Sequence, residues 1–327
     1  MEAVKKPRYR IIARILLDNI VWLIFVFCMI GFSVSIRGFF SFVNYVNIIY
    51  HSVFIGTLAI AEAFVLISGN LDLSVESTAA ASAILSVWLT ASSPYASGIM
   101  MNTWGAFFLI LIMGVVIGFF NGFFVLKLRI ESFLVTLSTY IVIRAMAVWI
   151  TGGFGMNDLP SAFRFVDTTK LFRIPLMVFL MILFYVFFTF ILRRTKFGKH
   201  LYIIGGNINA AYNFGINVNW ALFRVFILSG VISAITGWLM AARTNGATAG
   251  MGTGYLFEVL AAVVIGGVSL SGGVGSLVGV FAGSLILSSI HSALNITAVS
   301  PFITGVIRGL LILLAVSMDA LKRMFRK

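Results

Sequence analysis

The sequence predicts an all-α integral membrane protein with about ten transmembrane helices, two of which border interrupted or short segments. Hydrophobic residues make up 61% of the 327 residues and charged residues only 10%, whereas a soluble domain carries about 25% charged residues. The mean hydropathy is +1.08. Because a spanning helix needs roughly 20 apolar residues, the length accommodates ten spans and short loops. We therefore treat residues 1–327 as a single transmembrane domain.

The basic residues are grouped, and their grouping predicts orientation. The net charge is +13, and fifteen of the 23 Lys and Arg lie in four segments, 5–14, 127–129, 193–199 and 322–327. Short cytoplasmic loops of membrane proteins are enriched in Lys and Arg. We therefore place these segments, and with them both termini, in the cytoplasm. The positive net charge is explained by this positive-inside bias of a protein embedded in the lipid bilayer. We therefore expect no nucleic-acid partner.

Apolar runs define the spans in order. The first follows the basic N-terminal segment, the second ends at a polar interruption, the fourth and sixth end on basic clusters, and the tenth leads into the basic C-terminal segment. Alternating their direction puts every basic cluster on one side, which is the positive-inside arrangement. The predicted spans are 19–36, 47–67, 75–91, 104–126, 133–150, 174–192, 221–241, 255–267, 277–296 and 302–318.

Two interruptions, at 68–74 and 268–275, share a pattern of Gly, Ser and Leu after an apolar run. Non-helical backbone at membrane depth is tolerated only where protein buries it or where it lines a water-filled cavity. Paired interrupted segments in two halves of a chain indicate a transport pathway. Tight turns at the membrane surface remain the alternative.

The sequence contains no pattern for catalysis. The glycine-rich stretch 266–279 has no lysine and so is not a phosphate-binding loop. The histidines are far apart in sequence, and Cys28 is the single cysteine. We therefore expect neither an enzyme nor a cofactor or metal in this chain.

Six charged residues lie within or beside the apolar runs: Glu62, Asp72, Glu76, Arg144, Glu258 and Arg308. Charged side chains at membrane depth normally face protein or water. An ion pair between Glu62 and Arg144 is possible, because both lie well inside their spans. Asp72 and Glu76 flank the first interruption, where helix capping is the alternative to a functional role.

Three stretches carry a resemblance to a known family: residues 67–77 (ISGNLDLSVES), Asn121-Gly122 followed by 133–137, and 195–216 continuing into 252–275. In this order they resemble the ribose/galactose/xylose-type permeases of bacterial ABC sugar importers. The resemblance implies a type II ABC importer-like fold in the bacterial cytoplasmic membrane. It also implies alternating access that moves a monosaccharide or similar small polar solute inward.

The resemblance also implies partners. ABC ATPase subunits would hold ATP and Mg, a second permease copy or a paralogue would complete the path, and an extracytoplasmic binding protein would deliver the solute. Residues 197–216 resemble the family's cytoplasmic coupling segment, which docks on the ATPase. Its candidate residues are Phe197, Gly198, Asn207, Ala210, Ala211 and Gly215. The candidate pathway or gate residues are Asn70, Asp72, Ser74, Phe133, Thr136, Glu258 and Ser269.

Departures from the family pattern leave the solute and the pairing open. Asn70 and Glu76 replace family glycines, and Glu258 is a longer acid than the family's. The alternative class is an ion-coupled secondary carrier that works without an ATPase and uses Glu62, Asp72 or Glu258. A channel filtered by residues 272–275 is a further alternative, although nothing suggests the fourfold arrangement that such filters usually have.

Overall fold

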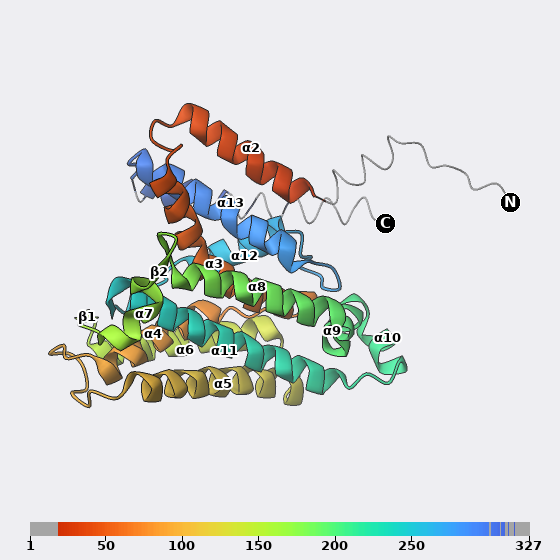
Figure 1. Ribbon diagram of the computed structural model, residues 1–327. Coiled ribbons are helices and arrows are strands. Elements are labelled where there is room, and N and C mark those ends of the chain that lie inside the picture. Colours follow the sequence, from red (N-terminus) through yellow and green to blue (C-terminus); the bar gives the residue numbers. More distant parts are fainter. Residues whose placement is uncertain (1–18, 301, 308, 311–312, 314–316, 318–327) are drawn as a thin grey trace.

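The computed structural model describes residues 19–300, 302–307, 309–310, 313 and 317. This part of the chain is mostly helical (Figure 1). Its apolar helices are α2 (Ile20–Ser35), α3 (Phe42–Ile67), α4 (Val75–Thr90), α5 (Thr103–Lys127), α6 (Ser132–Thr151), α8 (Leu176–Arg194), α11 (Val218–Thr244), α12 (Tyr255–Ile265) and α13 (Leu277–Ile296).

These helices coincide with the first nine predicted spans. Six of them, α3, α5, α6, α8, α11 and α13, are long and apolar enough to cross a membrane, while α2, α4 and α12 are shorter. The tenth predicted span, 302–318, lies mostly outside the described residues. A multi-span helical membrane protein is thus confirmed, and the total of ten stays a prediction.

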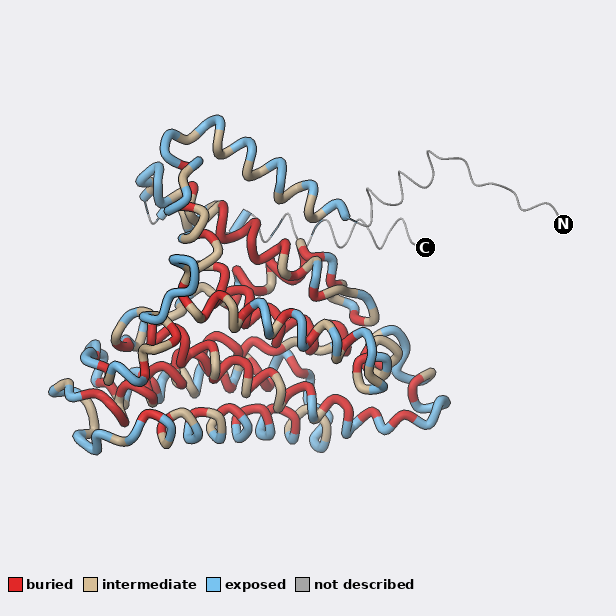
Figure 2. The backbone as a smooth tube through the Cα atoms, viewed as in Figure 1, coloured by how far each residue is buried: buried red, intermediate tan, exposed pale blue. Residues whose placement is uncertain are grey.

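Burial separates central helices from peripheral ones (Figure 2). The apolar window of α3 is 83% buried and that of α11 is 78% buried, whereas that of α6 is only 22% buried. A helix that is apolar all round and enclosed by others belongs to the centre of a bundle. Helices α5, α6 and α8 instead expose many large apolar side chains, as expected of surfaces that meet lipid or another membrane subunit.

Glycines let the central helices approach closely. A Cβ added to Gly114 of α5 would lie 2.5 Å from the carbonyl oxygen of Gly230 on α11. On α13, Gly279 and Gly283 lie against the backbone of α12 in the same way. Gly279 and Gly283 thus give α13 a small-residue face on which α12 packs closely.

The connection 151–173, between the fifth and sixth predicted spans, contains regular structure. Strand β1 (Met156–Asn157) pairs antiparallel with β4 (Gly246–Ala247). Helix α7 (Ser161–Thr168) follows, and then a hairpin of β2 (Lys170–Leu171) and β3 (Ile174–Pro175). Helix α7 forms because Phe163 and Val166, three residues apart, are both fully buried against the bundle.

The opposite end carries the predicted coupling segment, which forms two short helices. Helix α9 (Lys196–Gly206) directly follows α8, and α10 (Ile208–Asn213) precedes α11. The Thr195 hydroxyl accepts from Gly198 N at 3.2 Å, and Asn207 Oδ1 accepts from Ala210 N at 3.0 Å. These N-caps explain why the segment breaks into two helices at Asn207.

Candidate functional site

The first interruption is an extended segment held by side chains of α6. Helix α3 ends at Ile67, and α4 begins at Val75. Between them, Leu71 N donates to Ser132 Oγ and Leu73 N donates to Thr136 Oγ1, each at 3.1 Å. Backbone groups that lack helical partners are thus satisfied by hydroxyls one turn apart on α6. The second half of the interruption, Asp72 to Ser74, is buried in protein, whereas Gly69 near its start is exposed.

Asp72 is the centre of a buried hydrogen-bond network. Its Oδ1 accepts from Ser74 N at 3.0 Å and from Ser74 Oγ at 2.5 Å, and its Oδ2 accepts from Ser229 Oγ at 2.6 Å. Its backbone N donates to Glu62 Oε1 at 3.4 Å. Asp72 therefore ties the interruption to α3 and α11.

The network continues from Ser74 to α5 and α6. Asn121 Nδ2 donates to Ser74 Oγ at 2.9 Å, and Thr139 Oγ1 donates to Asn121 Oδ1 at 2.7 Å. All three side chains are buried. Asp72, Ser74, Asn121 and Thr139 thus satisfy one another in the interior and hold the interruption against α5, α6 and α11.

Glu76 pairs with Arg144, and the predicted Glu62–Arg144 pair is wrong. Glu76 Oε1 lies 2.5 Å from Arg144 Nη2. Glu76 Oε2 accepts from Gly254 N at 3.1 Å and from Leu256 N at 2.9 Å, at the start of α12. Arg144 reaches the loop before α12, where it donates to the carbonyl oxygens of Ala249 and Met251. Glu62 instead lies beside Asp72 at the first interruption, so the two side chains do not pair.

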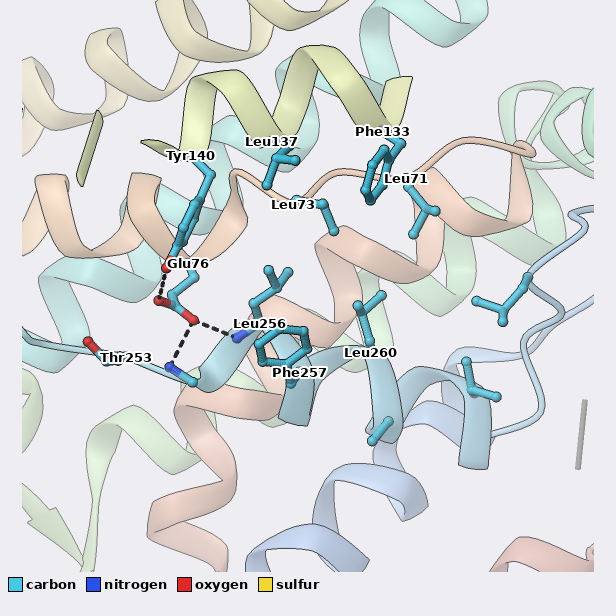
Figure 3. A pocket seen from close by; sticks show the side chains of 14 residues that line it. Leu71, Leu73, Glu76, Phe133, Leu137, Tyr140, Thr253, Leu256, Phe257 and Leu260 are labelled. Carbon is cyan, nitrogen blue, oxygen red and sulfur yellow. Dashed lines mark hydrogen bonds between the residues drawn. The ribbon is translucent and has the colours of Figure 1, made fainter. Parts of the chain in front are cut away.

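A cavity of about 530 Å³ lies between the first interruption, α6 and α12 (Figure 3). Glu76, Tyr140 and Thr253 lie together at one part of its wall, and Tyr140 Oη donates to Glu76 Oε1 at 3.4 Å. The rest of the lining is almost wholly apolar. It comprises Leu71, Leu73, Phe133, Leu137, Gly254, Leu256, Phe257, Leu260, Ala261, Val264 and Leu270.

The second interruption touches the first. Helix α12 ends at Ile265, and the chain then turns through Gly267, Gly272 and Gly273, all with positive φ. Gly273 N donates to the carbonyl oxygen of Ile67, at the end of α3, at 2.9 Å. The two predicted interruptions are therefore joined by a backbone hydrogen bond.

Helix α9 packs on the same backbone contact through Gly205. A Cβ on Gly205 would overlap the Ile67 carbonyl and lie 2.6 Å from Gly273 N, and a Cβ on Gly272 would lie 2.8 Å from the Cα of Gly69. We call these residues, Ile67, Gly69, Gly205, Gly272 and Gly273, the glycine junction. Both interruptions and α9 meet there through backbone atoms alone.

The candidate coupling residues divide into two groups. Gly198 and Ala211 are buried, Ala210 and Phe197 are half-buried, and Phe197 stacks on Phe64 with ring centroids 6.4 Å apart. These residues hold the segment to the bundle. Asn207 caps α10 and is exposed, like Gly215, which turns the chain at φ +71°.

Sequence reasoning missed the apolar side chains that α10 and the following turn present to solvent. Phe214 is 75% exposed, and Ile208 and Tyr212 are also exposed. Large exposed apolar side chains that gather on one short helix and its following turn are typical of a protein-docking surface. Their spacing of four residues from Ile208 to Tyr212 is the signal that identifies this face.

The candidate pathway residues are also divided. Phe133 lines the cavity. Asp72 and Ser74 belong to the buried hydrogen-bond network, Thr136 accepts from Leu73 N in the first interruption, and Glu258 is buried on α12. Asn70 and Ser269 lie half-buried, one in each interruption. The structure also brings together His51 and His291, which are far apart in sequence, with their ring centroids 4.1 Å apart and stacked.

In the part of the chain that the structure describes, His, Cys, Asp and Glu do not gather in a group of three that could hold a metal ion. Interrupted membrane helices that meet beside an apolar cavity are the arrangement of a solute permease. The family comparison agrees: the chain belongs to the family described as "Branched-chain amino acid transport system / permease component", whose model matches residues 44–316.

Relatives cover most of the chain. The L-arabinose transport system permease protein AraH of Escherichia coli K12 is 31% identical over 92% of this chain and 89% of its own. The galactose/methyl galactoside import permease protein MglC of the same strain is 33% identical over 87% and 88%. The ribose import permease protein RbsC of Haemophilus influenzae is 30% identical over 86% of each. No solved structure matches. The resemblance read from the motifs is confirmed.

Proposed function

We propose that this chain is the membrane-spanning subunit of a binding-protein-dependent ABC importer for a monosaccharide or a similar small polar solute. The observation that carries the proposal is the glycine junction. There, the helix that begins the cytoplasmic segment contacts both interruptions, and the first interruption forms part of the cavity wall. A push on that segment would therefore reach the cavity directly.

The relatives' names support a sugar rather than an amino acid, since they are transport proteins for arabinose, ribose and galactose. The cavity agrees with this. An amino acid brings both a carboxylate and an ammonium group, and the charged group in the cavity wall, Glu76, is already paired with Arg144. An apolar wall holds a polar solute weakly, so selection belongs to the extracytoplasmic binding protein and passage to this chain.

ATP hydrolysis belongs to partner ATPase subunits, which would hold ATP and Mg. The exposed apolar face of α10, with Phe214 beyond it, is the proposed docking surface for such a subunit. In this scheme residues 197–216 work as the coupling segment. Gly198 and Ala211 fix it to the bundle while Ile208, Tyr212 and Phe214 enter a groove of the ATPase.

A second permease, identical or paralogous, would complete the cavity. Phe133 is 47% exposed and Phe257 is 54% exposed, although both line the cavity. Large apolar side chains at an open edge of a transport path indicate that another subunit covers it. The orientation that fits this assembly places both termini and α9–α10 in the cytoplasm of the bacterial cell, in accord with the basic residues.

The ion-coupled carrier remains a second candidate because Glu62 and Asp72 are buried side by side. Neighbouring buried acids are a common form of proton or cation site in carriers. Asp72, however, already accepts hydrogen bonds from Ser74 and Ser229 with both oxygens. The network therefore gives Asp72 a structural role in the importer.

The test begins with gentle extraction of the tagged chain from its own membrane and identification of co-purifying proteins. The importer predicts an ABC ATPase in about equal amount, and uptake of labelled arabinose, ribose or galactose that stops without ATP and continues in an ionophore. A chain that purifies alone, and whose uptake collapses in the ionophore with ATP intact, would establish the carrier. Uptake of leucine with no uptake of sugars would reject the substrate class alone.

A further inference from the structure

A second hollow lies between α8 and α13, away from the cavity. This groove has a volume of about 420 Å³ and shares no lining residue with the cavity. It lies along two helices that are neighbours in Figure 1. The groove is lined by Ile182, Tyr185, Val186, Thr189, Phe190, Arg193, Arg194, Val278 and Phe281.

The walls of the groove are apolar and face away from the bundle. Ile182, Val186 and Phe190 are spaced four residues apart on α8, so they form one stripe, and all three are exposed. The base is fixed. Tyr185 Oη donates to Gly56 O at 2.9 Å, and the Tyr185 ring packs on Phe281 with centroids 4.8 Å apart. The groove is thus a rigid apolar trough on the outer surface of a membrane helix pair.

One end of the groove is strongly basic. Arg193 and Arg194 lie one turn beyond Phe190, on the same stripe, and both are exposed. Arg193 Nη2 donates to Ser276 Oγ at 3.1 Å, which places this guanidinium at the start of α13. The first turn of α13 has no acidic residue, and none of the described residues that line the groove is acidic. The partial positive charge of the α13 N-terminus adds to that of the arginines.

We propose that this groove binds an anionic phospholipid, with an acyl chain along the apolar walls and the phosphate group at Arg193 and Arg194. The guanidinium fork matches phosphate oxygens, and an apolar trough that ends in two cations matches the two parts of such a lipid. A second copy of the chain fits less well, because a symmetric contact here would bring two pairs of arginines together. In the orientation proposed above, the basic end faces the anionic cytoplasmic leaflet. The inference depends on neither the solute nor the energy source.

The test uses the purified full chain and equal amounts of added phosphatidylglycerol and phosphatidylcholine, with bound lipid counted by native mass spectrometry. The wild type is expected to retain phosphatidylglycerol preferentially. Arg194→Gln leaves the Arg193–Ser276 bond in place and is expected to lower that preference about fivefold, and the double variant R193Q/R194Q is expected to lower it by the same factor again.

The matched control is K127Q/R129Q, which removes two positive charges from another basic cluster that the groove does not include. It is expected to keep the preference of the wild type. Val278→Trp, which fills the groove and leaves both arginines, is expected to lose bound phosphatidylglycerol. Monodisperse elution shows that each variant is folded, and if R193Q/R194Q is not, R194Q and V278W decide the result.

An unchanged preference in R194Q and in the double variant would overturn the proposal. An equal loss in K127Q/R129Q would overturn it as well, because the attraction would then be a diffuse effect of net charge. A Val186→Cys variant in a Cys28→Ser background tests protein as the occupant. Efficient disulfide-linked dimers of that variant in membranes would show that a second copy covers the groove.

Discussion

At the residue scale, the Glu76 carboxylate takes part in an ion pair and several hydrogen bonds. It binds Arg144, accepts from two backbone N–H groups at the start of α12, and accepts from Tyr140. Arg144 in turn donates to the carbonyl oxygens of Ala249 and Met251 at 2.8 and 3.0 Å. The pair therefore joins α4, α6, α12 and the loop that precedes α12.

Glu76→Ala should destabilise the chain by about 3–5 kcal/mol, because it leaves a largely buried arginine without its counter-ion. Arg144→Ala should cost less, since Glu76 would keep its two backbone donors. Thermal unfolding of E76A, R144A and the double variant in one detergent measures the coupling between them. Additive losses in the double variant would show that the ion pair itself contributes nothing.

Asp72→Ala should lower the free energy of unfolding by about 1–3 kcal/mol for each partner left unsatisfied, which here means Ser74 and Ser229. Asp72→Asn keeps the shape and one acceptor oxygen, and the Ser229 hydroxyl can rotate to accept from the new amide. We therefore expect D72N to keep most of the stability and, in the importer, most of the uptake. Loss of uptake in a stable D72N protein would favour the ion-coupled carrier instead.

At the scale of elements, α9 is the link between the docking surface and the two interruptions. A methyl group on Gly205 cannot fit against the Ile67 carbonyl and Gly273 N without a backbone shift. Such a shift typically costs about 1–3 kcal/mol in a packed region. The backbone shift would disturb the contacts of the glycine junction, which we propose transmit motion between the ATPase and the cavity.

Gly205→Ala is therefore expected to reduce ATP-dependent uptake strongly at normal expression, while Gly206→Ala, where nothing lies within 4 Å of the added Cβ, is expected to behave as the wild type. Both are measured as uptake per folded protein in reconstituted vesicles. Equal activity of the two variants would remove the glycine junction from the coupling route.

Phe214→Asp tests the docking surface directly. Phe214 is 75% exposed and makes little contribution to the fold, so its replacement should leave the melting temperature nearly unchanged. A charge at the centre of an apolar contact should weaken the ATPase complex by more than tenfold. Co-purified ATPase per permease gives the measurement, with Asn219→Asp, on the neighbouring exposed surface, as the control for charge alone.

Across the whole molecule, the features that could be predicted are those encoded by residues close together in the sequence. The interruptions were predictable because Gly69, Asn70 and Ser74 break an apolar run, and the nine apolar helices follow from hydropathy alone. Segment 197–216 was singled out through its resemblance alone; the buried Ala211 and the cap at Asn207 explain how it folds, and its coupling role stays a prediction.

The other features of the site and fold could not be predicted, because they depend on contacts between segments that are distant in sequence. Arg144 lies 68 residues from its partner Glu76, and its choice of that acid over Glu62 depends on where α4, α6 and α12 converge. The glycine junction joins residues from three separate segments and is invisible in any one of them. Helix α7 was missed because its signal rests on only two buried side chains, Phe163 and Val166.

The burial of α3 has a consequence for biogenesis. Its partners include α11 and α13, which are synthesised much later, and its hydropathy of 1.7 is well below the 2.5 of α5. At about 5–20 residues per second, the chain between Ile67 and Val218 takes roughly 8 to 30 s to emerge. During that interval Glu62 and the hydroxyls of α3 lack the helices that will surround them. The nascent second span should therefore stay beside the insertion machinery until α11 arrives, which site-specific photocrosslinking from α3 to that machinery would reveal.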